Sequence, residues 1–100
     1  MSPEGIFHNC YGEKTDIWAF GVLIYELLHG ITPFDHCKTK QDLKKWVIQP
    51  LADNRFKHDI PVGLKQLIRN LMEIDETKRP NIQQVADQPY MKQLMARLNP

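Results

Sequence analysis

Three adjacent side chains that can bind metal ions, Asp35, His36 and Cys37, form the densest cluster of reactive groups in this chain of 100 residues. Carboxylate, imidazole and thiolate groups are the ligands that zinc uses in proteins. Consecutive residues rarely close a tetrahedron around one ion, however, and no second cluster of such residues accompanies them. We therefore expect a solvated loop here and no metal site.

The two cysteines, Cys10 and Cys37, show neither a CxxC pair nor the spacing of a zinc finger. We expect unpaired thiols in a reducing compartment rather than a disulfide. No signal peptide is indicated, because Glu4 and His8 interrupt the apolar residues near the N-terminus. The long apolar run over residues 17–28 is shorter than the roughly 20 residues that span a bilayer. These patterns favour a cytoplasmic or nuclear protein without a transmembrane segment.

The composition is that of an ordinary soluble domain, with 42% hydrophobic and 25% charged residues. The formal net charge is +1, and Lys and Arg are interleaved with Asp and Glu. We expect neither nucleic acid nor a membrane as a partner, because the sequence contains no basic stripe. The length suits one small domain or part of one.

The longest predicted helix begins at Asp16, a good N-cap residue, and ends at Gly30, with Pro33 preventing its continuation. Apolar side chains surround nearly its whole circumference: Ile17, Trp18, Phe20, Val22, Leu23, Ile24, Leu27 and Leu28. A helix without a polar face belongs in the middle of a larger assembly.

A further helix is predicted over an apolar stripe at helical spacing, which consists of Leu64, Leu67, Ile68, Leu71 and Met72. Before it, a helix is predicted over residues 40–48, where Thr39 and Asp42 make a capping-box pattern. After it, a short helix is introduced by Pro80 and Asn81 and broken by Pro89. Residues 93–100 should form a short helical tail. No stretch alternates like a strand, so we predict an all-α fold.

Several short patterns occur in an order typical of one family. Ser2, Pro3 and Glu4 resemble the Ala-Pro-Glu triad that closes the activation segment of protein kinases. Asp16, Trp18 and Gly21 match that family's Asp-x-Trp-x-x-Gly. An acidic turn at residues 75–76 and the Arg79-Pro80 pair complete the series. Over residues 1–92 the chain thus resembles the C-terminal portion of a eukaryotic protein kinase domain.

The resemblance implies the helical lower part of a kinase C-lobe, incomplete by itself. It implies a serine/threonine type, because residues 71–74 lack the Cys-Trp of tyrosine kinases. Residues 1–4 and 88–92 look similar to NIMA-related kinases. The full-length family uses ATP and magnesium. Its implied partners are protein substrates or docking proteins.

The groups that this family uses for catalysis are missing from the 100 residues. No G-x-G-x-x-G, Val-Ala-Ile-Lys, His-Arg-Asp or Asp-Phe-Gly occurs. His58-Asp59 lacks the intervening Arg, and Leu64 stands where a magnesium-binding Asn would fall. We expect no catalytic, cofactor-binding or metal-binding residue here and no activity of the isolated chain. With the upstream lobe missing, the longest helix should leave apolar surface exposed, so the isolated protein should aggregate or unfold without cooperativity.

The kinase-motif positions should therefore act through structure: Ser2, Pro3, Glu4, Asp16, Trp18, Gly21 and Arg79. We expect Asp16 to cap its helix and Trp18 to lie in the core. The resemblance implies that a guanidinium fork from Arg79 holds the Glu4 carboxylate.

An alternative to a kinase fragment is a non-catalytic helical module that binds proteins through residues 39–50. The lysines of that segment, Lys38, Lys40, Lys44 and Lys45, should form the exposed face of an amphipathic helix. An unrelated helical domain is disfavoured by the order of the patterns.

Overall fold

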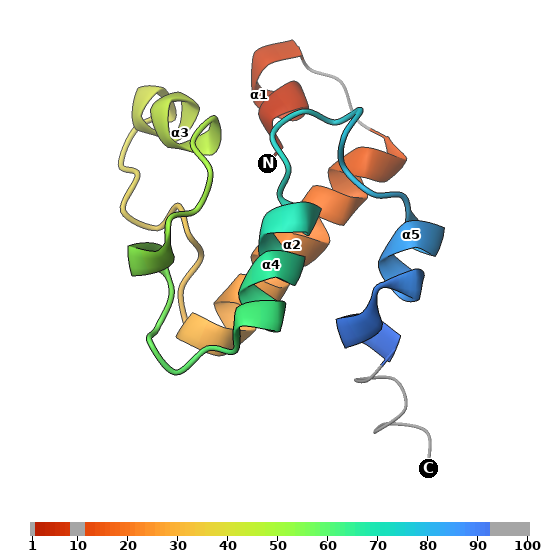
Figure 1. The fold of residues 1–100 in the computed structure, drawn as a ribbon. Helices are drawn as coiled ribbons and strands as arrows, with labels where there is room; N and C mark the ends of the chain where they lie inside the picture. The colour runs from red at the N-terminus through yellow and green to blue at the C-terminus, as the bar shows by residue number, and fades with distance from the viewer. Residues whose placement is uncertain (1, 9–11, 93–100) are drawn as a thin grey trace.

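The computed structural model describes residues 2–8 and 12–92, and within these ranges it contains helices and no strand. The elements are α1 (Pro3–His8), α2 (Glu13–His29), α3 (Lys40–Val47), the 3₁₀ helix η1 (Asp53–Arg55), α4 (Val62–Leu71) and α5 (Ile82–Asp87) (Figure 1). The predicted all-α fold is confirmed.

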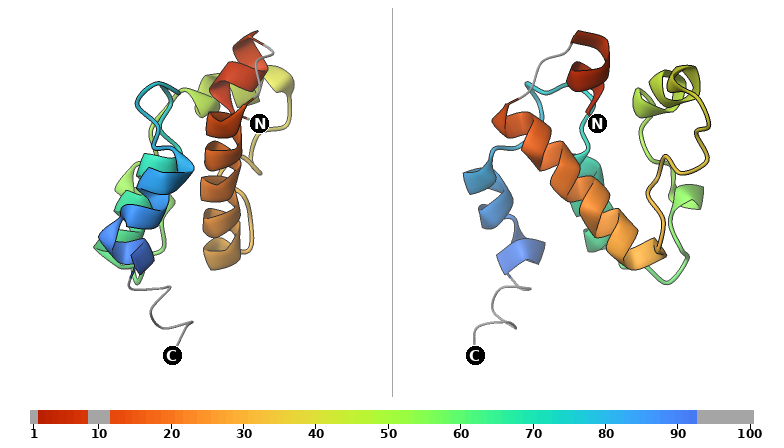
Figure 2. Two further views of the ribbon diagram at one scale, coloured as in Figure 1. Left: turned by 90° about the vertical axis from the view of Figure 1, so that its right-hand side faces the viewer. Right: turned by 180° about the vertical axis from the view of Figure 1, so that it is seen from behind.

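Helix α2 lies in the middle of the arrangement. Figures 1 and 2 show α4 alongside it, α5 on one side and α3 on the other. The contacts between elements are most extensive between α2 and α4, while α1 packs against α3. None of the described helices is both long and apolar enough to pass through a lipid bilayer.

The start of α2 differs from the prediction that Asp16 is its N-cap. The helix begins at Glu13, after Gly12 in extended conformation, and the hydroxyl oxygen of Thr15 accepts a hydrogen bond from the Gly12 N–H at 3.2 Å. Asp16 is exposed in the first turn, where a carboxylate still interacts favourably with the helix dipole. The capping function belongs to Thr15, because its hydroxyl reaches back to the residue before the helix.

The end of α2 is as predicted. Gly30 has a φ of 77°, and its N–H donates to the Glu26 carbonyl at 2.8 Å. A residue with a Cβ is strained in this left-handed conformation, which explains why a glycine ends the helix.

Local capping also fixes the shorter helices. The Thr39 hydroxyl accepts from the Asp42 N–H at 3.1 Å, but the Asp42 carboxylate turns to the Lys38 N–H, at 3.4 Å, and does not close the predicted box. The box before α5 is complete, with Asn81 and Gln84 bonding each other's N–H at 2.8 Å. Pro89 ends α5 and opens a helical segment at residues 89–92. The predicted tail over residues 93–100 lies outside the described residues, as does Cys10.

Helix α1 and the 3₁₀ helix η1 were not predicted. Helix α1 spans six residues and includes Gly5, so no apolar stripe can develop along it. Its start is nevertheless well defined, because Pro3 occupies the first helical position and the Ser2 hydroxyl accepts from the Gly5 N–H at 3.2 Å.

The core is formed where α2 and α4 face each other. Its buried apolar residues are Ile17, Trp18, Tyr25, Val47, Leu51, Phe56, Leu64, Leu67, Ile68, Leu71, Met72 and Val85. Gly21 allows the close approach: a Cβ there would lie 2.9 Å from the Cβ of Leu71 and 2.7 Å from Cγ of Met72. The opposite side of α2 is open, with Leu27 77% and Leu23 49% exposed. The predicted uncovered apolar surface on this helix is therefore present.

Candidate functional site

A buried ion pair joins the start of the described chain to a segment near its C-terminal end. The guanidinium of Arg79 donates two parallel hydrogen bonds to the Glu4 carboxylate, from Nη1 to Oε2 at 2.7 Å and from Nη2 to Oε1 at 3.1 Å. The side chains are 0% and 5% exposed. The pair predicted from the kinase resemblance is present, and it connects α1 to the turn before α5.

Arg79 leaves none of its five N–H groups unbonded. Besides Glu4, the guanidinium donates to three backbone carbonyls: Lys14 at 2.7 Å, Glu73 at 2.8 Å and Ile74 at 3.3 Å. A buried charge is costly unless it is paired and hydrogen-bonded, and here both conditions are met. The Arg79 side chain thereby holds α1, the first turn of α2 and the segment after α4 in one cluster.

The Glu4 carboxylate is held in its ionised form. It accepts a further bond from the Thr15 hydroxyl at 3.0 Å. Burial acts to raise the pKa of Glu4, but the bonds and positive charge of Arg79, a backbone N–H and the Thr15 hydroxyl together hold the pKa below its ordinary value. The Lys14 ammonium adds a bond to the Arg79 carbonyl. We call the set of Glu4, Lys14, Thr15, Trp18 and Arg79 the anchor cluster.

Trp18 forms the floor of the anchor cluster. Its ring is fully buried, and the Arg79 guanidinium lies 5.2 Å from the ring centre, close enough for a cation–π interaction. The ring also stacks on Phe34, with the ring centres 6.2 Å apart. Its Nε1 is without a hydrogen-bond partner among the described residues. The expectation of a core position for Trp18 is confirmed.

The structure brings some of the predicted positions together and separates others. Ser2 and Pro3 are buried beside Glu4 at the start of α1. Asp16 is exposed on α2 and has no contact with the anchor cluster among its hydrogen bonds. Gly21 lies further along α2, against α4. Sequence reasoning missed Lys14 and Thr15; the one available signal was the helical spacing of Thr15 and Trp18, which places both on one face.

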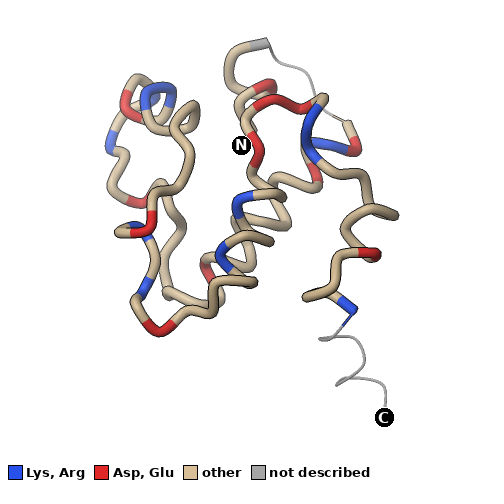
Figure 3. Tube along the Cα trace, in the orientation of Figure 1, with Lys and Arg blue, Asp and Glu red and all other residues tan. Residues whose placement is uncertain are grey.

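Neither member of the Glu4–Arg79 ion pair is suited to transfer a proton. Arginine does not lose its proton in proteins, and a carboxyl of lowered pKa stays ionised at neutral pH. The cluster therefore acts as a structural tie. Positive and negative residues are interspersed along the described parts of the trace (Figure 3).

The sequence cluster at residues 35–37 does not converge on one point. Asp35 accepts a bond from the Thr32 hydroxyl at 2.7 Å, and the His36 ring packs edge-on against Trp46. Cys37 is free, and burial, followed by the nearby Asp42 charge, raises the pKa of its thiol. In the described part of the chain no group of three His, Cys, Asp or Glu side chains could hold a metal ion.

A second ion pair lies at the other end of the core. Arg69 on α4 donates from Nη2 to Oδ1 of Asp53 at 2.5 Å and from Nε to the Leu51 carbonyl at 2.8 Å. Here the side chains are 32% and 81% exposed. The Arg69 hydrogen bond and charge lower the pKa of Asp53. This pair fastens η1 to α4 at the surface.

The fold and the anchor cluster together define a helical lobe whose two ends are tied by a buried charge pair. Comparison with known families identifies it: residues 1–91 match the family model described as the protein kinase domain. The chain belongs to the protein kinase family.

Individual relatives agree with this assignment. The chain is 35% identical over 95 residues to calcium-dependent protein kinase 9 of Oryza sativa subsp. japonica, which covers 91% of this chain and 16% of that protein. It is 31% identical over 100 residues to Aurora kinase C of Mus musculus, covering 100% and 35%. The structure of the twitchin kinase region from C. elegans superposes with a TM-score of 0.74 at 29% identity, covering 90% of this chain and 16% of that one. The chain therefore corresponds to a part of its relatives.

Proposed function

We propose that the chain forms the C-terminal part of the catalytic domain of a serine/threonine kinase. In the complete domain, ATP supplies the phosphoryl group with magnesium, and a Ser or Thr hydroxyl of a protein substrate receives it. Two relatives carry serine/threonine kinase in their names, one from Mus musculus and one from Dictyostelium discoideum. A cytoplasmic or nuclear location and a likeness to NIMA-related kinases belong to the same proposal.

The observation that carries this proposal is the buried Glu4–Arg79 pair. In the kinase resemblance, Glu4 ends the triad that closes the activation segment, a loop whose position controls catalysis. A bidentate bond from Arg79 fixes that end of the segment against α2. The same geometry is supported by the packing of Ser2, Pro3, Trp18 and Gly21. Asp16 stabilises the first turn of α2 from the surface. These are positioning roles, and no phosphate, metal or hydroxyl is assigned to any of the 100 residues.

The test is a radiolabelled-ATP assay on a general protein substrate. The 100-residue chain is compared with a longer protein in which the glycine loop, the strand lysine and the His-Arg-Asp and Asp-Phe-Gly motifs precede it. We expect turnover by the longer protein only. Turnover by the short chain that survives purification and is lost on mutating its own residues would overturn the proposal. An inactive longer protein with an intact set of motifs would favour a binding module instead.

A further inference from the structure

The ring of His29, at the end of α2, lies between two backbone groups of opposite kind. Its Nδ1 is 2.9 Å from the carbonyl oxygen of Tyr25, one turn earlier, and its Nε2 is 3.1 Å from the backbone nitrogen of Lys57. A carbonyl oxygen can only accept a hydrogen bond, and a backbone N–H can only donate one. Nδ1 must therefore carry the proton and Nε2 must lack one, so the two contacts specify a neutral imidazole in a single tautomer.

His29 belongs to a set of contacts that holds Arg55, Phe56 and Lys57, which we call the strap, against the end of α2. The Tyr25 hydroxyl donates to the Arg55 carbonyl at 2.5 Å, and the Lys57 N–H donates to His29. Between these bonds the buried Phe56 ring lies 5.7 Å from the Tyr25 ring and 6.0 Å from the His29 ring, measured between centres. Of the two polar bonds, only the one to His29 depends on a side chain that titrates near neutral pH.

The charged residues of the elements packed around His29 are one carboxylate and four cations: Glu26 on α2, Arg55 and Lys57 in the strap, and Lys65 and Arg69 on α4. Glu26 forms no ion pair with the ring among the described residues. The two cations of α4 lie 5.9 Å and 5.2 Å from the centre of the Phe56 ring. The C-terminal end of a helix favours a protonated imidazole, whereas nearby cations disfavour it. Neither effect supplies an acceptor for a proton on Nε2.

We propose that His29 is a pH-sensitive latch for the strap. When the ring takes up a proton from solvent at mildly acidic pH, Nε2 becomes a donor that faces the N–H of Lys57, so an attractive contact becomes repulsive. The Nδ1 bond to the Tyr25 carbonyl and the Tyr25 bond to Arg55 need no change. The strap should therefore leave α2 at Lys57 while Arg55 stays attached. This device requires neither ATP nor catalysis, so it does not rest on the proposed function.

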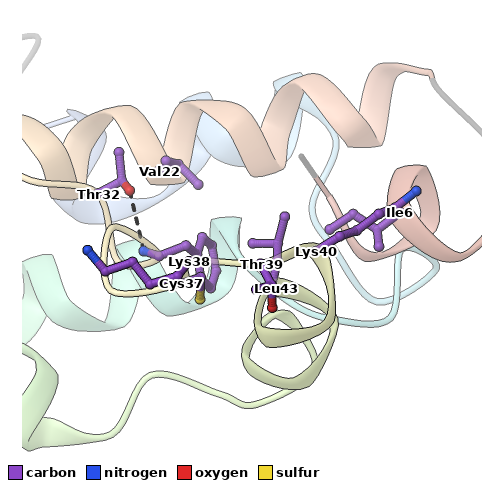
Figure 4. Close-up of a pocket in the computed structure, with 9 residues that line it drawn as sticks. Ile6, Val22, Thr32, Cys37, Lys38, Thr39, Lys40 and Leu43 are labelled. Atoms are coloured by element: carbon purple, nitrogen blue, oxygen red, sulfur yellow. Dashed lines mark hydrogen bonds between the residues drawn. The ribbon is translucent and has the colours of Figure 1, made fainter.

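The strap also supports the segment that joins α2 to α3. The Arg55 guanidinium donates to the Pro33 carbonyl. Pro33 stands between Thr32 and Phe34, two residues that line a cavity of about 540 Å³ between α1, α2 and α3 (Figure 4). Loosening of the strap should therefore reach this wall of the cavity, but less than the end of the strap, because the bond from Tyr25 remains.

The tautomer of His29 is tested by NMR of the ring nitrogens, with isotope-labelled histidine in a longer kinase protein that carries the chain. The His29 signals are those absent from the spectrum of the His29→Gln variant. At about pH 7.5 we expect a proton on Nδ1 and none on Nε2, and at about pH 5.5 a proton on both. A proton on Nε2 at the higher pH would overturn the proposal.

Amide hydrogen exchange of the same protein measures the opening of the strap. From about pH 7.5 to about pH 5.5, the protection of the Lys57 amide, corrected for the intrinsic pH dependence of exchange, should fall about three- to tenfold, as expected for one lost hydrogen bond. In His29→Gln the side-chain oxygen can accept from Lys57 and does not titrate, so protection should not change with pH. The matched control, His58→Gln, removes an exposed imidazole beside the strap and should show the same fall as the unchanged protein.

Three results of the exchange experiment would contradict the latch. The Lys57 amide of the unchanged protein could be equally protected at both pH values. The fall in protection could persist in His29→Gln, or it could disappear in His58→Gln. Each of these results would show that a group other than His29 governs the strap, or that the strap does not open on acidification.

Discussion

The two arginine–carboxylate pairs of this protein use the same chemistry in opposite surroundings. Arg79 and Glu4 are buried and come from residues 75 positions apart, while Arg69 and Asp53 lie at the surface, 16 positions apart. Both arginines also donate to backbone carbonyls. What differs is the cost of losing a partner: water replaces it at the surface, but no water reaches a group enclosed by Trp18 and three chain segments.

The comparison shows that burial, rather than bond length, decides what an ion pair contributes. The exposed pair is as short as the buried one, yet exposed pairs add little to stability because solvent and salt screen them. The buried pair is part of a network in which every donor of the guanidinium is used. We therefore expect its disruption to be felt across α1, α2 and the segment before α5.

The largest effect should follow Arg79→Ala. It leaves the Glu4 carboxylate buried without its partner, and breaking a buried pair costs about 3–5 kcal/mol. Urea unfolding followed by circular dichroism measures this loss in a longer kinase protein that carries the chain. The stability of Arg79→Lys should fall between those of Arg79→Ala and the unchanged protein, because an ammonium keeps the charge but not the forked geometry of the guanidinium.

Removing both partners is the control for that prediction. The pair Glu4→Gln with Arg79→Met leaves no charge unpaired, so it should recover part of the stability lost in Arg79→Ala, although three backbone carbonyls still lose their donor. A midpoint for Arg79→Ala close to that of the unchanged protein would show that the buried pair resembles the exposed one after all.

The contact between α2 and α4 connects the two regions, and Gly21→Ala tests how tightly they are joined. The added Cβ would lie 2.9 Å from the Leu71 Cβ, which the helix backbone holds in place. Overpacking of this kind costs about 1–3 kcal/mol. The matched change is Gly12→Ala, where a Cβ meets nothing within 4 Å and the backbone is extended. Thermal melts of the two variants should differ clearly, and equal melting points would mean that the helices move apart readily.

Acidification should weaken the buried pair by protonating Glu4. Because the folded-state pKa of Glu4 is lowered from 4.5, its contribution to stability is complete above that value and is lost as the pH falls through the lower, folded-state pKa. Glu4→Gln should be less stable at neutral pH but should lose less stability between neutral and acidic pH. Melting points measured across this range decide the matter, and parallel curves for the two proteins would contradict the assignment.

The smallest effect should follow Asp53→Asn. The carboxylate is largely exposed, and Arg69 keeps its bond to the Leu51 carbonyl. At physiological salt the melting point should not change measurably, and a small decrease should appear only at low ionic strength. A decrease that persists in high salt would show that this pair is also structurally important.

The fold was predictable wherever its causes are local. Thr39, Asn81 and Gly30 act on residues within one turn of themselves, so the sequence pattern indicates where α3 and α5 begin and where α2 ends. The start of α2 was misplaced because its N-cap is Gly12, which has no side chain to signal a cap, and the Thr15 hydroxyl closes the cap from within the first turn. Helix α1 is too short to show a period.

The anchor cluster was predictable only in part. The Glu4–Arg79 pair came from the family resemblance, because nothing local connects two residues so far apart. Its backbone acceptors, at Lys14, Glu73 and Ile74, could not be found in this way, since every residue carries a carbonyl and only the folded path of the chain brings three of them to one guanidinium.

The distance along the chain between Glu4 and Arg79 also matters during synthesis on the ribosome. Glu4 is made first, and its guanidinium partner is made 75 residues later. At translation rates of about 5–20 residues per second, this interval lasts roughly 4–15 s. Throughout it, α1 lacks the ion pair with Arg79, and until α4 is made, α2 presents its apolar side uncovered. We expect the nascent chain to depend on chaperones in this interval, until the last third of the sequence closes the structure.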